Sequence, residues 1–358
     1  MTLIVNRVNA GDFFFNGNAV EKGYLNGQLF WERRLEIWTS RYLTGGQTIY
    51  WGYFNIDSVI QSIAPGFQGD VICHVDCPIV STNVEYPLDA GPSAPYRGYR
   101  SLTIRIEPNG RVFGYGGYGG AGGVSRINNG YSYPSYPVPG DGKVHGDQYN
   151  RGGAGGAKGG DGGSCIHCRG VAALVVPGAW NQYILAGGGG GGGGAKLNSN
   201  HRAGGGGGGR GHNNAPGGPA VFPGGDGSGG AWGLGGRGDE GPNNYGGARQ
   251  QPNTPGYGGL SVNWGENGWA PGNGGNGGTW NQSGGGGAMS LQLWTNWSNE
   301  GHFKGRDGNY APSPTERGYS AAPGSRGSSH DYRRPWADGG WSGHSGIPVY
   351  QPRAIYYY

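Results

Sequence analysis

The sequence predicts an all-β N-terminal domain followed by a glycine-rich bundle of polyglycine, or polyproline-II-type, helices with projecting aromatic loops, and little or no α-helix. Glycine supplies 86 of the 358 residues and is concentrated after residue 110, whereas ordinary usage is about 7%. The chain is also 12% aromatic and only 13% charged. Because disordered chains are typically poor in aromatic residues and rich in charge, this composition favours order.

Residues 1–112 are expected to form the β-rich domain. Its first part contains short β-prone runs separated by Asn16-Gly17 and Asn26-Gly27, and Asn-Gly pairs supply the positive φ angles of tight hairpin turns. Alternating or β-branched runs predict further strands at 48–56, 71–75 and 101–106. The one plausible helix is short, at about residues 56–63.

Residues 113–290 are expected to form the glycine bundle. Gly187–Gly194, Gly204–Gly209 and Gly284–Gly287 are pure glycine, so they have no side chains with which to bury an apolar face. A polyproline-II helix has three residues per turn and no internal hydrogen bonds. Its N–H and C=O groups must therefore bond to neighbouring helices, which glycine allows to approach closely. Residues 291–358 are expected to form an aromatic, loop-rich C-terminal segment.

Three different structures could also contain glycine runs. A flexible linker does not suit the tryptophans that interrupt the runs, and collagen would need a sustained Gly-X-Y period. A disordered RNA-binding tail is the stronger rival, because Arg151-Gly152-Gly153 resembles one RGG unit and arginine and aromatic side chains can stack on bases. There is, however, no array of such units.

At two places a β-prone segment runs directly into polyglycine. Residues 101–106 (SLTIRI) lead through Asn109-Gly110 to Gly114, and residues 172–176 (AALVV) lead through 183–186 to Gly187. This pattern resembles the glycine-rich adhesins of tailed bacteriophages, such as the distal tail-fibre adhesins of T-even-like phages. Residues 24–31 (YLNGQLFW) also resemble the start of many phage tail proteins.

The resemblance implies a virion tail protein whose N-terminal domain binds other phage tail proteins and whose loops bind a bacterial surface receptor, either an outer-membrane protein or a glycan. It is compatible with a homotrimer. The chain departs from the family in its longer N-terminal domain and in the insert 288–348, which has few glycine runs. A structural tail or baseplate component without receptor contact is the main competing hypothesis, and a glycine-rich RNA-binding protein is a more distant one.

Aromatic residues between the glycine runs are the candidates for receptor contact, because Tyr and Trp give large contact areas at low entropic cost. Each of them could instead cover the glycine scaffold or pack one loop against another. The candidates are Tyr131, Tyr133, Tyr136, Tyr245, Trp264, Trp269, Trp280, Trp294 and Trp297, with Trp336 and Trp341 also in the last insert.

Four cysteines occur as two close pairs, Cys73 with Cys77 and Cys165 with Cys168, each with a histidine inside. Such spacing suits tetrahedral zinc, although the distance between the pairs is not that of a zinc finger. The four residues could equally form disulfides, within or between the pairs, or remain free thiols. We favour no metal and expect no cofactor.

We expect no catalysis. A depolymerase with paired carboxylates is the one catalytic alternative, although nothing in the sequence places two of the 22 Asp and Glu residues together. The sequence contains no G-x-x-x-x-G-K-[ST] phosphate loop and no G-x-S-x-G nucleophile elbow. The net charge of +4 is too small to indicate nucleic acid binding. We expect no signal peptide and no membrane insertion, because the first ten residues lack the pattern of a leader and no run of about 18 apolar residues occurs. The protein is therefore expected to be made in the host cytoplasm.

Overall fold

The computed structural model describes both backbone and side chains for part of the chain, and the backbone alone for several short strands. Backbone and side chains are described for residues 34–67, 69–81, 83–90, 100–120, 122, 156–168, 172–194, 206–211, 272, 274–288, 305–322 and 339–358. The backbone alone is described for short strands at 14–15, 18–19, 22–25, 28–32, 144–145, 269–270, 290–292 and 336–337.

The first described elements are two antiparallel strand pairs. Strand β1 (Phe14–Phe15) pairs with β2 (Asn18–Ala19), and β3 (Lys22–Leu25) pairs with β4 (Gln28–Glu32). Asn16-Gly17 and Asn26-Gly27 stand between the paired strands in the sequence. The hairpins expected at both positions are confirmed.

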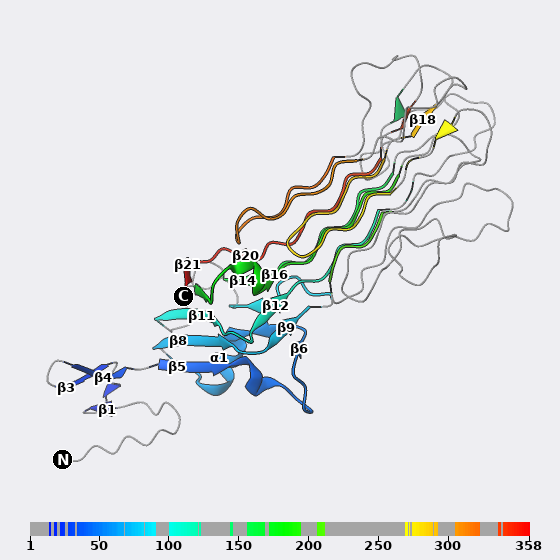
Figure 1. The fold of residues 1–358 in the computed structure, drawn as a ribbon. Coiled ribbons are helices and arrows are strands. Elements are labelled where there is room, and N and C mark those ends of the chain that lie inside the picture. The colour runs from blue at the N-terminus through cyan, green and yellow to red at the C-terminus, as the bar shows by residue number, and fades with distance from the viewer. Residues whose placement is uncertain are drawn as a thin grey trace.

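The next part of the chain winds through three parallel sheets, one strand in each sheet per winding (Figure 1). The first sheet has the order β21 (Ala354–Tyr357), β15 (Ala172–Val176), β11 (Ser101–Ile106), β8 (Asp70–Val75) and β5 (Arg34–Trp38). The second is β16 (Ile184–Leu185), β12 (Arg111–Phe113), β9 (Pro78–Val80) and β6 (Tyr50–Trp51). The third is β20 (Val349–Tyr350), β14 (Ile166–His167), β10 (Leu88–Asp89) and β7 (Phe54–Asn55). We call this three-sided unit, within residues 34–113, 164–186 and 347–358, the β coil.

Rows of apolar side chains fill the β coil. Alternate residues of β11 are buried, as period-two strands with one inward face require. Residues in register on successive windings therefore form inward rows, such as Ile37, Cys73, Ile104 and Leu174. A second row contains Phe54, Leu88, Ile166 and Val349. Each Ile, Leu, Val or Phe side chain in these rows contributes about 1.5–3 kcal/mol by leaving water.

Helix is sparse, as the sequence predicts. Helix α1 (Ile56–Ile63) occupies the expected residues; the side chain of Asn55 caps its first turn by accepting a hydrogen bond from the Ser58 N–H at 2.8 Å. Ile56 and Ile60, four residues apart on one helix face, are fully buried in the coil core. Within the described residues, the other helical pieces are the 3-10 turns η1 (Thr39–Tyr42) and η2 (Trp180–Gln182). The all-β class with little α-helix is thus confirmed.

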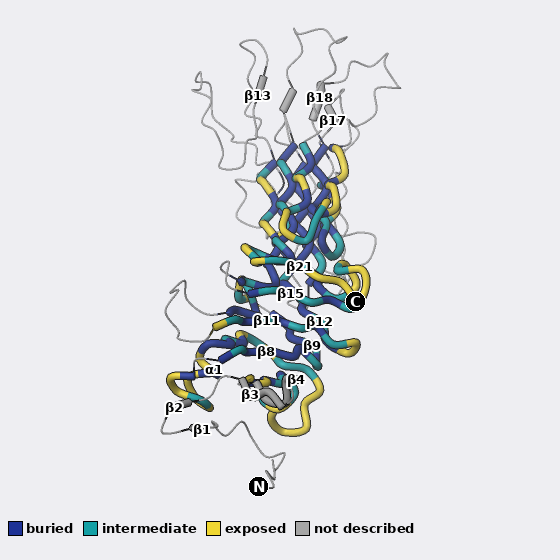
Figure 2. The backbone as a smooth tube through the Cα atoms, turned by 90° about the vertical axis from the view of Figure 1, so that its left-hand side faces the viewer, coloured by how far each residue is buried: buried dark blue, intermediate teal, exposed yellow. Residues whose placement is uncertain are grey.

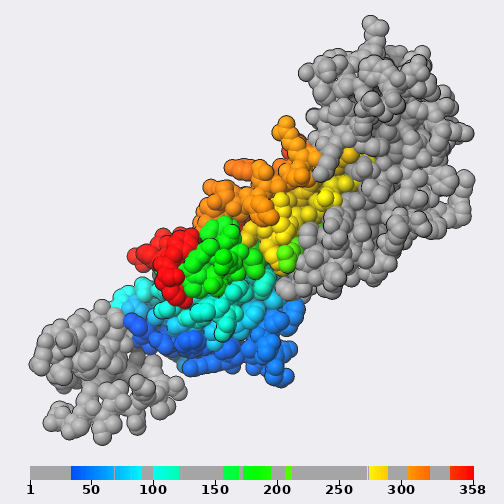
Figure 3. All heavy atoms as spheres, viewed as in Figure 1, coloured from blue at the N-terminus to red at the C-terminus, as the bar shows by residue number. Residues whose placement is uncertain are grey.

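The glycine-rich segments are two long insertions into the β coil. One lies between β12 and β14 and the other between β16 and β20. Because β12 pairs with β16 and β14 pairs with β20, both insertions leave the coil at the same corner. Figure 3 shows the last segment of the chain (red) against segments coloured green and cyan. The domains expected at 1–112, 113–290 and 291–358 are consecutive pieces of the chain. In the structure, strands from all three pieces pair in the one β coil, as β12 does with β16 and β14 with β20.

Candidate functional site

The insertions run side by side away from the β coil, around a central segment of pure glycine (Figure 1). The N–H groups of Gly187, Gly190 and Gly193 donate to the carbonyl oxygens of Gly163, Gly160 and Ala157 at 2.8–2.9 Å. Every third N–H group of the central segment thus donates to the same neighbouring segment, 156–163. The remaining N–H and C=O groups of 187–193 bond in other directions. In all, six segments bond to the central one: 114–120, 156–163, 206–211, 274–278, 282–288 and 339–346.

The six surrounding segments also bond to one another and close a ring. Their contacts, in order around the ring, are Gly160 N to Tyr118 O, Gly159 N to Trp341 O, Gly284 N to Gly343 O, Gly285 N to Asn276 O, Gly207 N to Gly275 O and Gly206 N to Gly120 O, at 2.6–3.1 Å. We call the central segment and its ring the glycine lattice. Buried backbone fills its interior (Figure 2). Buried N–H and C=O groups need hydrogen-bond partners, and here neighbouring segments supply them.

Only glycine fits the centre of the lattice. A Cβ added at Gly187 or Gly190 would overlap the carbonyl oxygen of Tyr115 or Tyr118, respectively. At Gly285, on the ring, the nearest atom to an added Cβ is 3.3 Å away, so a methyl group needs only a small shift there. The longest pure glycine run in the sequence is therefore the segment that is enclosed on all sides.

Two further segments, 305–309 and 318–322, lie outside the ring and are bound partly through serine hydroxyls. The Gly318 N–H donates to Ser345 Oγ at 2.7 Å, and Ser283 Oγ donates to the Gly318 carbonyl at 2.6 Å. Three residues before Ser345, Ser342 Oγ accepts from the Ala321 N–H at 2.6 Å. These serines are fully or almost fully buried. Sequence reasoning missed them, although their spacing of three was a usable signal.

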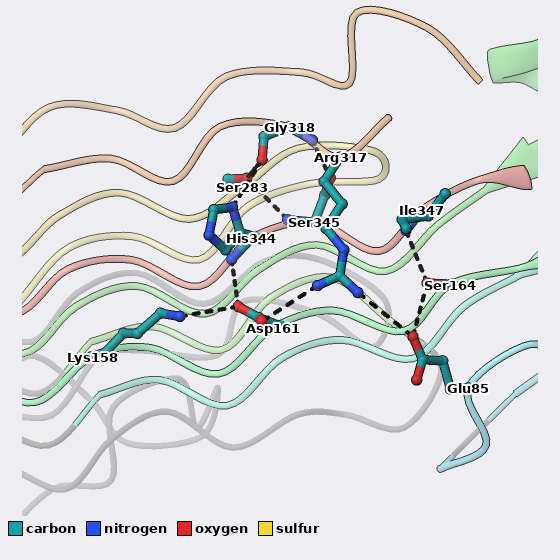
Figure 4. A network of polar contacts seen from close by, with 10 residues as sticks. All are labelled: Glu85, Lys158, Asp161, Ser164, Ser283, Arg317, Gly318, His344, Ser345 and Ile347. Carbon is teal, nitrogen blue, oxygen red and sulfur yellow. Dashed lines mark hydrogen bonds and ion pairs between the residues drawn. The ribbon is translucent and has the colours of Figure 1, made fainter. Parts of the chain in front are cut away.

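Residues 305–322, which contain these two segments and the turn between them, form what we call the outer hairpin. A polar network joins it to the lattice and to the β coil (Figure 4). The Arg317 guanidinium lies 3.6 Å from a Glu85 oxygen in the coil and 3.4 Å from an Asp161 oxygen in the lattice. Asp161 also accepts from the His344 N–H at 2.8 Å and lies 3.6 Å from Lys158 Nζ. The network therefore ties three separate stretches of chain together where the lattice leaves the coil.

Two turns, one in the lattice and one between the outer segments 305–309 and 318–322, cover edges of the β coil. Asn281, in a left-handed conformation (φ 58°), uses its side-chain amide in place of a strand. Its Oδ1 accepts from the Ala186 N–H at 2.8 Å and its Nδ2 donates to the Ile184 carbonyl at 3.1 Å. The Pro314 carbonyl accepts from the Val349 N–H at 2.7 Å. Two short turns thus pack against the coil at this end of the lattice, where the described segment 206–211 also ends.

At the opposite end of the lattice, several described segments stop where an insert begins or ends. Residues that flank the inserts 123–155, 195–205, 289–304 and 323–338 bond to one another at this end: Gly120 to Gly191 and Gly206, Gly193 to Ala157 and Gly340, and Arg306 to Gly286 and Ala322. A small antiparallel sheet lies there too, in the order β13 (Val144–His145), β19 (Trp336–Ala337), β18 (Ser290–Gln292) and β17 (Trp269–Ala270). We call this the distal sheet; its strand β18 is labelled in Figure 1.

The structure separates two of the predicted aromatic candidates. Trp269 lies in the distal sheet. Trp280 lies in the turn against the β coil, where its ring centroid is 5.4 Å from that of Phe113 and 5.2 Å from Arg210 Cζ. Burial lowers the pKa of Arg210. Of the others, Trp336 is in the distal sheet and Trp341 is in the lattice. Tyr131, Tyr133, Tyr136, Tyr245, Trp264, Trp294 and Trp297 lie outside the described residues.

All four cysteines are buried free thiols. Burial raises the pKa of Cys168 to about 12, and it also raises the pKa of Cys73 and of Cys165. They are therefore neutral at ordinary pH. The disulfide hypothesis has no bond to support it among the described residues. In the same part of the chain, no group of three or more His, Cys, Asp or Glu residues is arranged to hold a metal ion.

Comparison with known proteins gives one weak similarity. No family model and no curated protein matches the sequence. The chain is similar to a chain in the crystal structure of the gp37-gp38 adhesin tip complex of the bacteriophage S16 long tail fiber, with a TM-score of 0.33 and 20% identity over 71% of this chain and 69% of that one. At this TM-score the similarity does not establish a common fold. Within the described residues, no helix has the length and apolar character needed to cross a bilayer.

Proposed function

We propose that this chain is a tail-tip or tail-fibre adhesin of a tailed bacteriophage that binds a bacterial surface receptor and carries out no catalysis. The glycine lattice would be a polyglycine-II scaffold that holds the aromatic inserts. The three-residue recurrence of its backbone hydrogen bonds is the spacing that a helix with three residues per turn requires. The resemblance of the β-to-polyglycine junctions to phage adhesins supports the same proposal.

One observation carries the proposal: the two ends of the lattice are built differently. At the coil end, short turns around Asn281 and Pro314 bond to coil strands. At the far end, the flanks of four long inserts meet. Recognition residues concentrate on loops that a rigid scaffold positions. The far end therefore suits receptor contact, and the coil with its N-terminal hairpins suits attachment to other tail proteins.

A binding comparison tests this proposal. The labelled full-length chain is added to susceptible cells and to otherwise identical cells that lack the receptor, and bound protein is measured. We expect saturable binding only to the susceptible cells, and pre-incubation with the chain should reduce infection by the phage. Equal binding to both cell types would contradict the adhesin role. A purely structural tail component would bind neither cell type, and an RNA-binding protein would show strongly salt-dependent RNA affinity instead.

A matched pair of variants separates scaffold effects from direct effects. Gly190→Ala places a methyl group against the Tyr118 carbonyl in the lattice centre, whereas Gly285→Ala places it where the nearest atom is 3.3 Å away. Neither residue belongs to an insert. If the scaffold positions the receptor-binding loops, Gly190→Ala should lose cell binding and Gly285→Ala should retain it.

A further inference from the structure

The inward rows of the β coil end differently in its three sheets. The last strands of the second and third sheets, β16 and β20, contribute Ile184 and Val349, which are fully buried. At the outer edges of these strands, the Asn281 amide donates to the Ile184 carbonyl, and the Pro314 carbonyl accepts from the Val349 N–H. The first sheet continues by one more strand, β21, where Ile355 is only partly buried. Turns therefore cover the ends of two sheets, and the third sheet ends in a strand.

Two residues of β21 continue inward rows but are themselves incompletely buried. Ile355 is opposite Leu174 and Tyr357 is opposite Val176, and both of these β15 residues are fully buried. Residues in register share a face of the sheet, yet Tyr357 is 55% exposed. A further strand beyond β21, with apolar side chains at alternate positions, would bury both Ile355 and Tyr357.

The backbone of β21 is also an edge of its sheet. It pairs with β15 on one side, and among the described residues no strand pairs with its other side. Such a side presents N–H and C=O groups on which another strand can add, and natural proteins often protect it with charged side chains. The opposite edge strand, β5, has exposed Arg34 and Glu36. The sequence of β21, AIYY, has no charged residue, so this edge lacks that protection.

We propose that β21 is a docking site for an extended segment of a partner polypeptide, which adds to the five-stranded sheet as one more strand. The segment has apolar side chains at alternate positions, which contact Ile355 and Tyr357, and a carboxylate near Arg353, the exposed residue that precedes β21. In strand addition, backbone hydrogen bonds supply affinity and alternate side chains supply specificity. This proposal does not depend on the adhesin function.

A single strand fits this place better than a second copy of the coil. The turns around Asn281 and Pro314 lie on the last strands of the other two sheets, so a second coil stacked on this end would meet them. A strand added to one sheet extends it by about 4.8 Å and leaves both turns in place. Sedimentation analysis of the free chain should therefore find no self-association through β21. A dimer that Tyr357→Lys dissociates would assign the edge to a second copy and overturn the proposal.

The test adds a fluorescent synthetic peptide to the full-length chain. In this peptide of about ten residues, valine alternates with threonine and glutamate stands at both ends. We expect saturable binding by fluorescence anisotropy and slower amide exchange in β21. Tyr357→Lys should weaken binding roughly tenfold, because it places a charge in the apolar contact. Tyr319→Lys is the matched control, since Tyr319 is 65% exposed on the outer hairpin. Arg353→Glu should weaken binding about threefold, and a peptide with lysine at both ends should then bind this variant better than the glutamate peptide.

Two methylated peptides distinguish strand addition from non-specific adhesion. Alternate residues of an added strand bond to its neighbour, so N-methylation of one set of alternate residues should abolish binding and methylation of the other set should preserve it. Equal binding of the two methylated peptides would overturn the proposal, and so would no binding of the original peptide at about 1 mM. Equal effects of Tyr357→Lys and Tyr319→Lys would also overturn it. Thermal unfolding checks each variant, and should Tyr357→Lys fail to fold, Arg353→Glu with the two charged peptides carries the same comparison.

Discussion

The β coil and the glycine lattice solve the same packing problem in opposite ways. In the coil, inward rows such as Ile37, Cys73, Ile104 and Leu174 fill the space between sheets. In the lattice, Gly187–Gly194 is buried with no side chain at all, and its N–H and C=O groups bond to six neighbours. The coil therefore loses stability when side chains become smaller, and the lattice loses it when they become larger.

The largest effect is expected from enlarging the lattice centre. Gly190→Ala sets a methyl group against the backbone of residue 118, which cannot move without breaking bonds to other segments. We expect a loss of more than about 3 kcal/mol, at the upper end of overpacking effects. Gly285→Ala should cost less than about 1 kcal/mol, because its neighbours need to shift only slightly. Thermal unfolding of the two variants measures the difference, and equal melting temperatures would contradict an enclosed centre.

The converse change in the coil comes next. Leu174 is fully buried in an inward row, so Leu174→Ala removes apolar contact and leaves a cavity. We expect a loss of about 2–5 kcal/mol in the free energy of unfolding. Denaturant titration measures this loss. The exposed residue Ile63 is the control, and Ile63→Ala should change stability by less than about 0.5 kcal/mol.

A smaller, local effect is expected at the buried serines. Ser345→Ala leaves the Gly318 N–H without its partner, and an unsatisfied buried donor costs about 1–3 kcal/mol. The loss should fall on the outer hairpin 305–322. Limited proteolysis followed by mass spectrometry should therefore show earlier cleavage in this hairpin, with the cleavage of the coil unchanged. Cleavage that accelerates equally everywhere would point to a global effect instead.

The ion pairs of Arg317 are expected to contribute less. They span 3.4–3.6 Å and their partners are partly exposed, and such pairs contribute about 0–1 kcal/mol. Arg317→Ala should therefore lower stability slightly in dilute buffer, and this difference should shrink at roughly molar salt, where charges are screened. A difference that is independent of salt would mean that Arg317 acts through packing.

At neutral pH the ionisation of the cysteines should have no measurable effect on stability. The pKa of Cys168 is raised from 9.0 to about 12 by burial, so the unfolded chain ionises first. The stability that this thiol provides is fully present below about pH 9 and is lost as the pH rises toward 12. At neutral pH, iodoacetamide should modify all four thiols only after unfolding. Fewer than four modified thiols in the unfolded, unreduced chain would restore the disulfide hypothesis.

Local patterns in the sequence predicted local structure well. The Asn-Gly pairs placed the hairpins β1–β2 and β3–β4, and the run at 56–63 placed α1. Runs of pure glycine also marked the segment whose backbone is enclosed. These features depend on neighbouring residues, whose preferences are visible in a single sequence.

Long-range features were not predictable in the same way. The β coil depends on parallel pairs such as β15 with β21 and β14 with β20, which join residues separated by the entire second insertion. Asn281 covers the edge of β16 only because a turn of the lattice returns to the coil. Similarly, Trp280 and Trp269 looked equivalent in the sequence, and only the pairing of distant segments assigns them to opposite ends of the lattice.

Amide hydrogen exchange of Gly187–Gly194 tests the central claim most directly, because the lattice must be ordered for its far end to present a binding surface. The N–H groups from Gly187 to Gly193 all donate to neighbouring segments. The lattice predicts exchange as slow as that of the coil strands β8 and β11, since opening the segment would break bonds to several neighbours together. Exchange at the rate of an unstructured chain would contradict the lattice and the adhesin proposal built on it.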